Sequence, residues 1–197
     1  PGRADADSLF QEAMEKARSN TIIAHVRRST GGDPCERNCH PFKHIYHDRG
    51  WLLAHNGFVT NGFDIHPDSK GETDSETIFH EIMDKVAEHQ QSGTFKGQYP
   101  AIKAAIKHIL DTYGSGIRLN LMISDGRTLY IFHHYQDWNG RDKPIFMLRR
   151  QKPYGSAILL STQRLSDENW EPLPKDCLLA ISGGEILVIS DPLITRS

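Results

Sequence analysis

Trp51-Leu-Leu-Ala-His-Asn-Gly57 decides the fold of this chain, because an apolar run ends there in a polar pair. The run predicts a core strand over residues 51–55, followed by a corner at Asn56-Gly57. Gly71-Glu-Thr-Asp-Ser-Glu76 follows after a short loop and places the carboxylate of Asp74 where a long amphipathic helix begins. Upstream, Ile22-Ile-Ala-His-Val-Arg-Arg-Ser-Thr30 is a further apolar run that delivers Arg27 at its end. An arginine, an aspartate and an Asn-Gly pair can together hold a zwitterionic amino acid and stabilise an oxyanion beside it.

The remaining pattern predicts an α+β fold with mainly antiparallel sheets. Helical periodicity predicts helices over residues 7–19, 75–89 and 98–113. Apolar and alternating runs predict strands over residues 21–27, 118–124, 128–135, 145–149 and 157–161, with a closing hairpin over 178–181 and 185–189. Residues 31–48 are expected to form a loop. The run of late hairpins favours antiparallel pairing.

Composition indicates an ordinary globular enzyme domain. The 197 residues, 38% of them hydrophobic, suffice for a single domain over 1–197. A net charge of −2 argues against nucleic acid or an anionic membrane as a partner. No apolar run approaches the ~20 residues of a membrane span. Three cysteines, an odd number, indicate a reducing compartment, so we expect a cytoplasmic protein.

The three motifs, in this order, resemble those of the class II glutamine amidotransferases, which are N-terminal-nucleophile hydrolases that release ammonia from the side-chain amide of glutamine. His40-Pro41-Phe42 and a late run from Thr162 to Pro174 resemble the small, free-standing branch of that family. The resemblance implies a four-layer α-β-β-α sandwich of the N-terminal-nucleophile (Ntn) hydrolase type.

The resemblance also implies the roles of five residues. Asn56, through its side-chain amide, and Gly57, through its N–H, would form the catalytic oxyanion hole. Arg27 and Thr30 would bind the substrate, with Arg27 on its carboxylate, and Asp74 would bind its ammonium group. Asp74 could instead be a helix cap, because Thr73-Asp-Ser-Glu76 is also a good helix-capping sequence.

The nucleophile is the missing part. In the family it is the thiolate of a cysteine at the mature N-terminus, whose own α-amine acts as base. This chain begins Pro1-Gly-Arg, so either its N-terminal portion, with the first strands, is not included or the protein is a homologue without the nucleophile. We favour the first explanation, because a fold without those strands would expose apolar edges. None of the three cysteines can offer its own α-amine: Cys35, Cys39 and Cys177.

Three hypotheses about function follow. The first is hydrolysis of glutamine or a related γ-glutamyl amide without a cofactor, with ammonia passed to a separate synthase. The second is a non-catalytic glutamine-binding or regulatory homologue. The third is a metal or redox module in a loop that holds five potential ligands: Cys35, Cys39, His40, His44 and His47. Their spacing matches no standard zinc site, so we expect no metal. His25 and His55 are expected to be structural hydrogen-bonding residues rather than general bases.

Overall fold

The computed structural model describes residues 7–26, 33, 35–46, 48–60, 62–89, 95–137, 139–151 and 155–194. Its helices are α1 (Ser8–Lys16), α2 (Asp74–His89) and α3 (Phe95–Tyr113), with short 3₁₀ turns η1 (Glu36–Asn38) and η2 (Gly114–Gly116). Its strands are β1 (Phe42–Tyr46), β2 (Arg49–Val59), β3 (Ile117–Ser124), β4 (Leu129–His134), β5 (Phe146–Gln151), β6 (Ser156–Ser161), β7 (Glu171–Pro172), β8 (Leu178–Ser182) and β9 (Glu185–Ile189).

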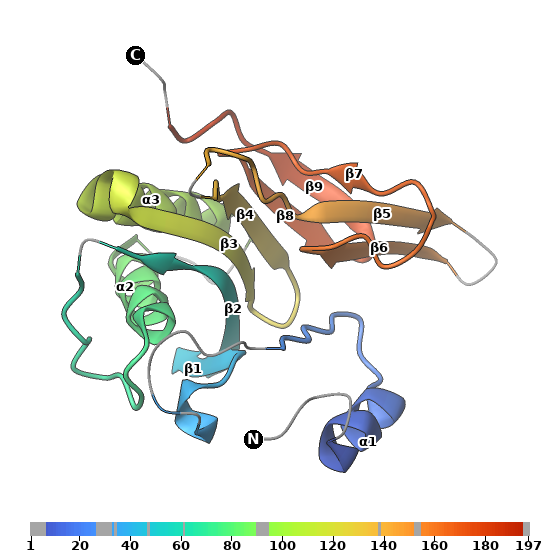
Figure 1. Ribbon diagram of the computed structural model, residues 1–197, viewed down its shortest axis with the longest axis horizontal. Coiled ribbons are helices and arrows are strands. Elements are labelled where there is room, and N and C mark those ends of the chain that lie inside the picture. Colours follow the sequence, from blue (N-terminus) through green and yellow to red (C-terminus); the bar gives the residue numbers. More distant parts are fainter. Residues whose placement is uncertain are drawn as a thin grey trace.

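The larger sheet has six antiparallel strands in the order β1-β2-β3-β4-β8-β9. Helices α2 and α3 cover one of its faces (Figure 1). The apolar residues of both helices fall at helical spacing and are buried against alternate residues of the strands, as amphipathic helices on a sheet require. The largest buried side chains of this core include Trp51, Phe79, Tyr130 and Phe132.

A second sheet, in the order β6-β5-β7, packs against the other face of the six-stranded sheet. Its core contains Ile131, Leu179 and Ile181 from the large sheet and Ile145 and Met147 from the β5 side. The α+β class and the two mainly antiparallel sheets are thus as predicted. The described residues form three of the expected layers: α2 with α3, the large sheet and the small sheet. The remaining helix, α1, buries none of its residues.

Three expectations about individual strands were wrong. Residues 21–26 form no strand and pair with no described strand, and the side chains of Ile22 and Val26 are 54% and 68% exposed. Residues 42–46, expected as loop, form β1 and pair with Arg49–Leu53 of β2. Strand β2 does not end at His55 but runs on to Val59, because β3 pairs with it along residues 52–59. The polar pair Asn56-Gly57 therefore lies inside a strand and not at a corner.

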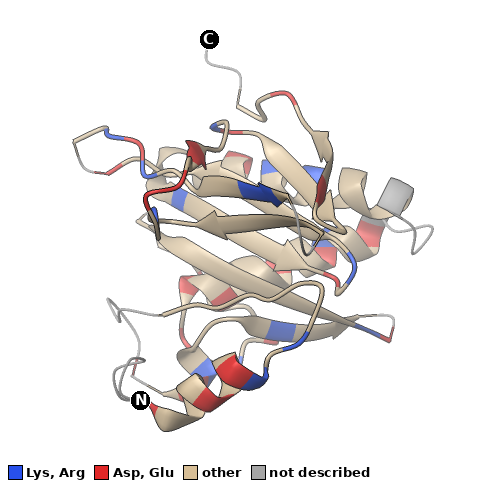
Figure 2. Cartoon of the chain, turned by 90° about the vertical axis from the view of Figure 1, so that its right-hand side faces the viewer, with Lys and Arg blue, Asp and Glu red and all other residues tan. Residues whose placement is uncertain are grey.

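Charged residues do not gather on one element. Figure 2 shows acidic and basic residues interspersed along the helices, strands and loops. Among the described residues, no helix is both long and apolar enough to cross a membrane.

Candidate active site

The site residues Asn56 and Gly57 lie on an edge of β2 that pairs on one side only. Strand β3 pairs with β2 through Val59, whereas β1 reaches only as far as Leu53. Thr60 N–H points toward the β3 side, where it donates to the carbonyl of Gly116 at 2.6 Å. Val59 N–H points the other way and donates to Asp74 Oδ2 at 2.9 Å. Because N–H directions alternate along a strand, Gly57 N–H points to the same edge as Val59 N–H.

Gly57 is required at its position by close packing. A Cβ placed there would lie 1.8 Å from the carbonyl oxygen of Arg118 and 2.4 Å from Nε2 of His55. Neither contact can be relieved by moving a flexible side-chain end, because one atom belongs to the backbone of β3 and the other to a buried ring. The absence of a Cβ therefore lets β2 approach β3 closely here.

Asp74 is the first residue of α2, but its carboxylate does not cap the helix. The cap is Thr73, whose Oγ1 accepts from Glu76 N–H at 3.3 Å. The carboxylate of Glu76 turns back instead to the N–H groups of Lys70 and Gly71, at 2.9 and 2.7 Å. Asp74 is thus left to face β2, where its Oδ2 accepts from Val59. The sequence left open whether Asp74 caps α2, and in the structure Thr73 makes the capping hydrogen bond instead.

A buried chain of hydrogen bonds joins Asp74 to the Arg118 carbonyl, which lies against Gly57. Ser75 Oγ lies 3.2 Å from Asp74 Oδ1 and 2.9 Å from Nδ1 of His55. On the other side of the ring, Nε2 lies 2.9 Å from the carbonyl oxygen of Arg118. Since a carbonyl only accepts, Nε2 carries the proton and donates it.

His55 is neutral in this chain. Burial lowers the pKa of His55, and the opposing effects of the Asp74 charge and the hydrogen bond to the Arg118 carbonyl do not outweigh it. With its proton on Nε2, the neutral ring offers Nδ1 as an acceptor to the Ser75 hydroxyl. The single hydroxyl proton of Ser75 is therefore shared between Nδ1 and Asp74 Oδ1. His55 has the structural hydrogen-bonding role that the sequence predicted.

The side chain of Asn56 belongs to the opposite face of the sheet from His55, because side chains alternate along β2. It is exposed, and its cross-strand partner is Asn120 on β3. Asn120 is buried and fully engaged: its Oδ1 lies 2.7 Å from Nδ1 of His133, and its Nδ2 donates to the carbonyl of Lys143 at 2.9 Å. Asn56 therefore stands at the end of a polar row between the two sheets with its amide open to solvent.

The described part of the arginine motif, residues 22–26, contacts the segment before β1 through His25. Arg27 and Thr30 lie outside the described residues. His25, two residues before Arg27, contacts the ring of His40 with centroids 4.3 Å apart. Strand β1 begins at Phe42, which pairs with Leu53 where the partnered part of this edge of β2 ends. His25 thus packs through His40 beside the start of β1, close to where the β2 edge becomes free.

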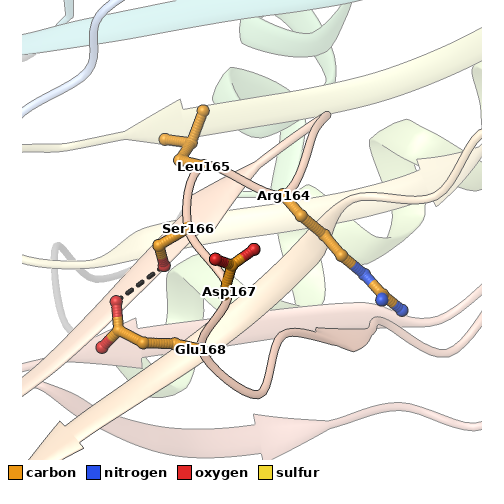
Figure 3. Close-up of a pocket in the computed structure, with 5 residues that line it drawn as sticks. All are labelled: Arg164, Leu165, Ser166, Asp167 and Glu168. Atoms are coloured by element: carbon orange, nitrogen blue, oxygen red, sulfur yellow. Dashed lines mark hydrogen bonds between the residues drawn. The ribbon is translucent and has the colours of Figure 1, made fainter.

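The late run that resembles the free-standing branch, Thr162 to Pro174, forms the loop after β6 and continues through β7. Five of its residues line an open hollow of about 450 Å³: Arg164, Leu165, Ser166, Asp167 and Glu168 (Figure 3). Arg150 holds Glu168 with two hydrogen bonds, at 3.0 and 2.6 Å. Ser166 donates to Glu168 at 2.7 Å and accepts from the indole of Trp170 at 3.1 Å. Asn56, Gly57 and Asp74, the predicted site residues that the structure describes, do not line this hollow. The hydrogen bonds of the run stabilise its own loop.

The two mainly antiparallel sheets, with α2 and α3 on the outer face of the larger one, have the arrangement of the Ntn-hydrolase fold. The family model for class-II glutamine amidotransferases matches residues 3–166. The chain therefore belongs to the class-II glutamine amidotransferases.

Curated relatives and solved structures agree with this assignment. The chain is 26% identical over 207 residues to the uncharacterized protein MJ1515 of Methanocaldococcus jannaschii, covering 92% of this chain and 56% of that protein. It is 28% identical over 168 residues to YafJ of Escherichia coli K12, whose own assignment as a glutamine amidotransferase is provisional, covering 84% and 62%. A crystal structure of a predicted glutamine amidotransferase from Pseudomonas aeruginosa matches at 25% identity and a TM-score of 0.64, covering 78% of this chain and 66% of that one. The chain thus spans about three-fifths of the curated relatives' length.

Sequence reasoning missed two members of the site. Val59 fixes the orientation of Asp74 through a backbone N–H, which no residue pattern reveals. Ser75 links Asp74 to His55, and its only signal was its place directly after the aspartate in a capping sequence.

Proposed function

We propose that this chain is the glutamine-hydrolysing domain of an amidotransferase, which releases ammonia from the side-chain amide of glutamine or of a related γ-glutamyl compound. The observation that carries the proposal is the free edge of β2. Gly57 N–H points to this edge, and Val59 N–H, two residues further along the strand, holds the carboxylate of Asp74 there. Two strand residues span roughly 7 Å, a distance that an extended glutamine can bridge.

Asp74 is proposed to receive the α-ammonium group of the substrate. Val59 N–H and the Ser75 hydroxyl use part of the acceptor capacity of its carboxylate, which has about four lone-pair sites. The remaining lone pairs can accept from an ammonium group. Arg27, with Thr30, would bind the α-carboxylate, since a guanidinium holds a carboxylate with two parallel hydrogen bonds.

Gly57 N–H and the Asn56 amide are proposed to hold the oxyanion. A thiolate attacks the amide carbon, and the carbonyl electron pair moves to the oxygen. The leaving nitrogen takes a proton and departs as ammonia, which leaves a γ-glutamyl thioester. Water then attacks the thioester, and glutamate and the thiol are released. Donors placed before the reaction stabilise the oxyanion without reorganisation.

We assign the thiolate to a cysteine at the mature N-terminus of a longer polypeptide. The cysteines within the described residues suit the role poorly. Burial raises the pKa of the Cys177 thiol, which disfavours its thiolate. Cys39 donates its thiol to the carbonyl of Cys35 at 3.3 Å. A separate ammonia-accepting synthase is the partner that this proposal implies.

Ammonia release by the complete protein tests the proposal, with glutamine and γ-glutamyl amides as substrates. Asn56→Ala should lower kcat by about 10²–10³ and leave KM nearly unchanged, because it removes one oxyanion donor. Asp74→Asn should mainly raise KM. Asn139→Ala, at an exposed turn position, is the matched control and should behave as the parent. Thermal stabilisation by glutamine without ammonia release would favour the non-catalytic homologue instead.

A further inference from the structure

A group of histidines and carboxylates lies outside the proposed glutamine site, where the loop after β2 meets α2. His66 and Asp68 come from that loop and His80 from the second turn of α2. One ligand atom from each of these three residues lies within 4.8 Å of the others. His44 on β1 adds a third imidazole, whose ring centroid is 5.3 Å from that of His80. From this convergence we propose a binding site for a divalent transition-metal ion of the Zn²⁺ class.

The donor set fits such an ion. Imidazole nitrogens with a carboxylate oxygen suit Zn²⁺, Co²⁺ or Ni²⁺ better than Mg²⁺ or Ca²⁺, which prefer oxygen ligands alone. Ligands around tetrahedral zinc lie roughly 3.3 Å apart, so the three atoms, now within 4.8 Å of one another, need to close by at most about 1.5 Å. His66 and Asp68 belong to a loop and can make that movement, whereas His80 is fixed on the helix.

His66 already has the outer partner that metal-binding histidines use. Its Nε2 lies 3.0 Å from Oδ2 of Asp84 on α2. A carboxylate at that distance keeps the proton on Nε2 and leaves the Nδ1 lone pair for an ion. Nδ1 accepts the N–H of Asp68 at 3.2 Å, a hydrogen bond that coordination of an ion would replace. The nitrogen that faces Asp68 is thus the one able to coordinate.

His80 is held in place for coordination. The residue is 8% exposed, and its ring stacks on that of His66 with centroids 5.0 Å apart. Asp68 is exposed, so an ion can reach the buried His80 from solvent.

An ion here would fasten the loop of residues 62–73 to α2, directly before Asp74. The loop already donates to α2 from Lys70 and Gly71 N–H, which bond Glu76, and from His66 N–H, which bonds Thr77 Oγ1 at 3.2 Å; the ion would add a further link between them. This site differs from the Cys35–Cys39 loop considered from the sequence and shares only His44 with it. The inference replaces the expectation that the chain holds no metal.

Zinc binding by the complete, chelator-treated protein tests the inference, with Zn²⁺ alone as the probe and Mg²⁺ as comparison. We expect one Zn²⁺ per chain by calorimetry and a Tm increase of roughly 5–10 °C at a hundredfold excess over Kd. His66→Gln and His80→Gln should each abolish or strongly weaken binding. Asp84→Asn should weaken it about 10–100-fold, because it removes only the outer partner.

Two controls separate this site from others. His108→Gln changes an exposed histidine on α3 and should leave zinc binding unchanged. The double variant Cys35→Ser with Cys39→Ser should also bind zinc as the parent does. The inference is overturned by the absence of stoichiometric zinc binding, by full binding in a folded His80→Gln protein, or by loss of binding in the cysteine double variant.

Discussion

Replacement of Gly57 by alanine is the perturbation whose consequence follows most directly from the structure. The added methyl carbon would lie 1.8 Å from the Arg118 carbonyl oxygen and 2.4 Å from the His55 ring nitrogen. Carbon–oxygen contacts in sheets are ordinarily about 3.3 Å or longer, so β2 and β3 must separate locally by about 1.5 Å. That movement also breaks the hydrogen bond from His55 to the Arg118 carbonyl.

The cost can be worked from these two effects. Overpacking costs about 1–3 kcal/mol, and the lost hydrogen bond adds about 1 kcal/mol. A total of roughly 2–4 kcal/mol in a domain of this size lowers Tm by roughly 4–16 °C. The N–H of Gly57 moves with the strand, so ammonia release should fall by about 10²–10³.

Gly50→Ala is the matched control on the same strand. A Cβ there would meet only the flexible Cε of Lys43, at 3.9 Å. The two variants are compared by thermal unfolding and by ammonia release from the complete protein. Gly50→Ala should match the parent in both measurements. If Gly57→Ala also matches the parent, the close approach of β2 to β3 and the role of the Gly57 N–H are both wrong.

Three further predictions concern the buried polar groups. Ser75→Ala should lower the free energy of unfolding by about 1–3 kcal/mol in urea titrations and raise KM, because it leaves the buried Nδ1 of His55 unsatisfied; an unchanged unfolding midpoint would contradict this. Tyr113→Phe should lower the free energy of unfolding by a similar amount, because it removes the hydroxyl that donates to Glu81 Oε1 at 2.7 Å. Equal urea midpoints for variant and parent would contradict this. Stability should fall as pH drops below about 6.5, because there the histidines of lowered pKa bind protons in the unfolded chain but not in the fold. Each contributes at most about 1.4 kcal/mol per pH unit to the free energy of unfolding. A flat profile in denaturant titrations between pH 7 and 5 would refute this. These histidines are His55, His80 and His133.

The helices could be predicted from the sequence because their period is local. Apolar side chains recur along α2 at the spacing that one helix face requires, and all of these are buried: Ile78, Phe79, Ile82, Met83 and Val86. The same applies to α3, where Ile102, Ala105, Ile106 and Ile109 fall at helical spacing and are buried. Burial of one face of a helix needs no knowledge of which strand lies beneath it.

Strand ends and pairings could not be predicted in the same way. Asn56-Gly57 is locally a turn signal, yet eight residues of pairing with β3 hold it in the strand. Residues 21–26 have a strand-like composition but no described strand to pair with, and β propensity alone does not form a ladder. β1 was missed because its lysine and histidine continue the polar character of the loop before it.

The role of Asp74 needed the tertiary structure. Its sequence context supports a cap and a ligand equally well. Only the contact with Val59, fifteen residues away, and the capping bond made by Thr73 separate the two. The roles of all five site residues remain predictions, and Arg27 and Thr30 also lie outside the described residues.

The central claim is that glutamine is cleaved at the free edge of β2 by an N-terminal thiolate. The most direct test is intact-mass analysis, with peptide mapping, of the complete protein quenched in acid during turnover of glutamine. The account predicts a γ-glutamyl thioester on an N-terminal cysteine, and its loss in Asp74→Ala. A glutamyl adduct on Cys35, Cys39 or Cys177, or turnover of glutamine without any N-terminal adduct, would contradict the account.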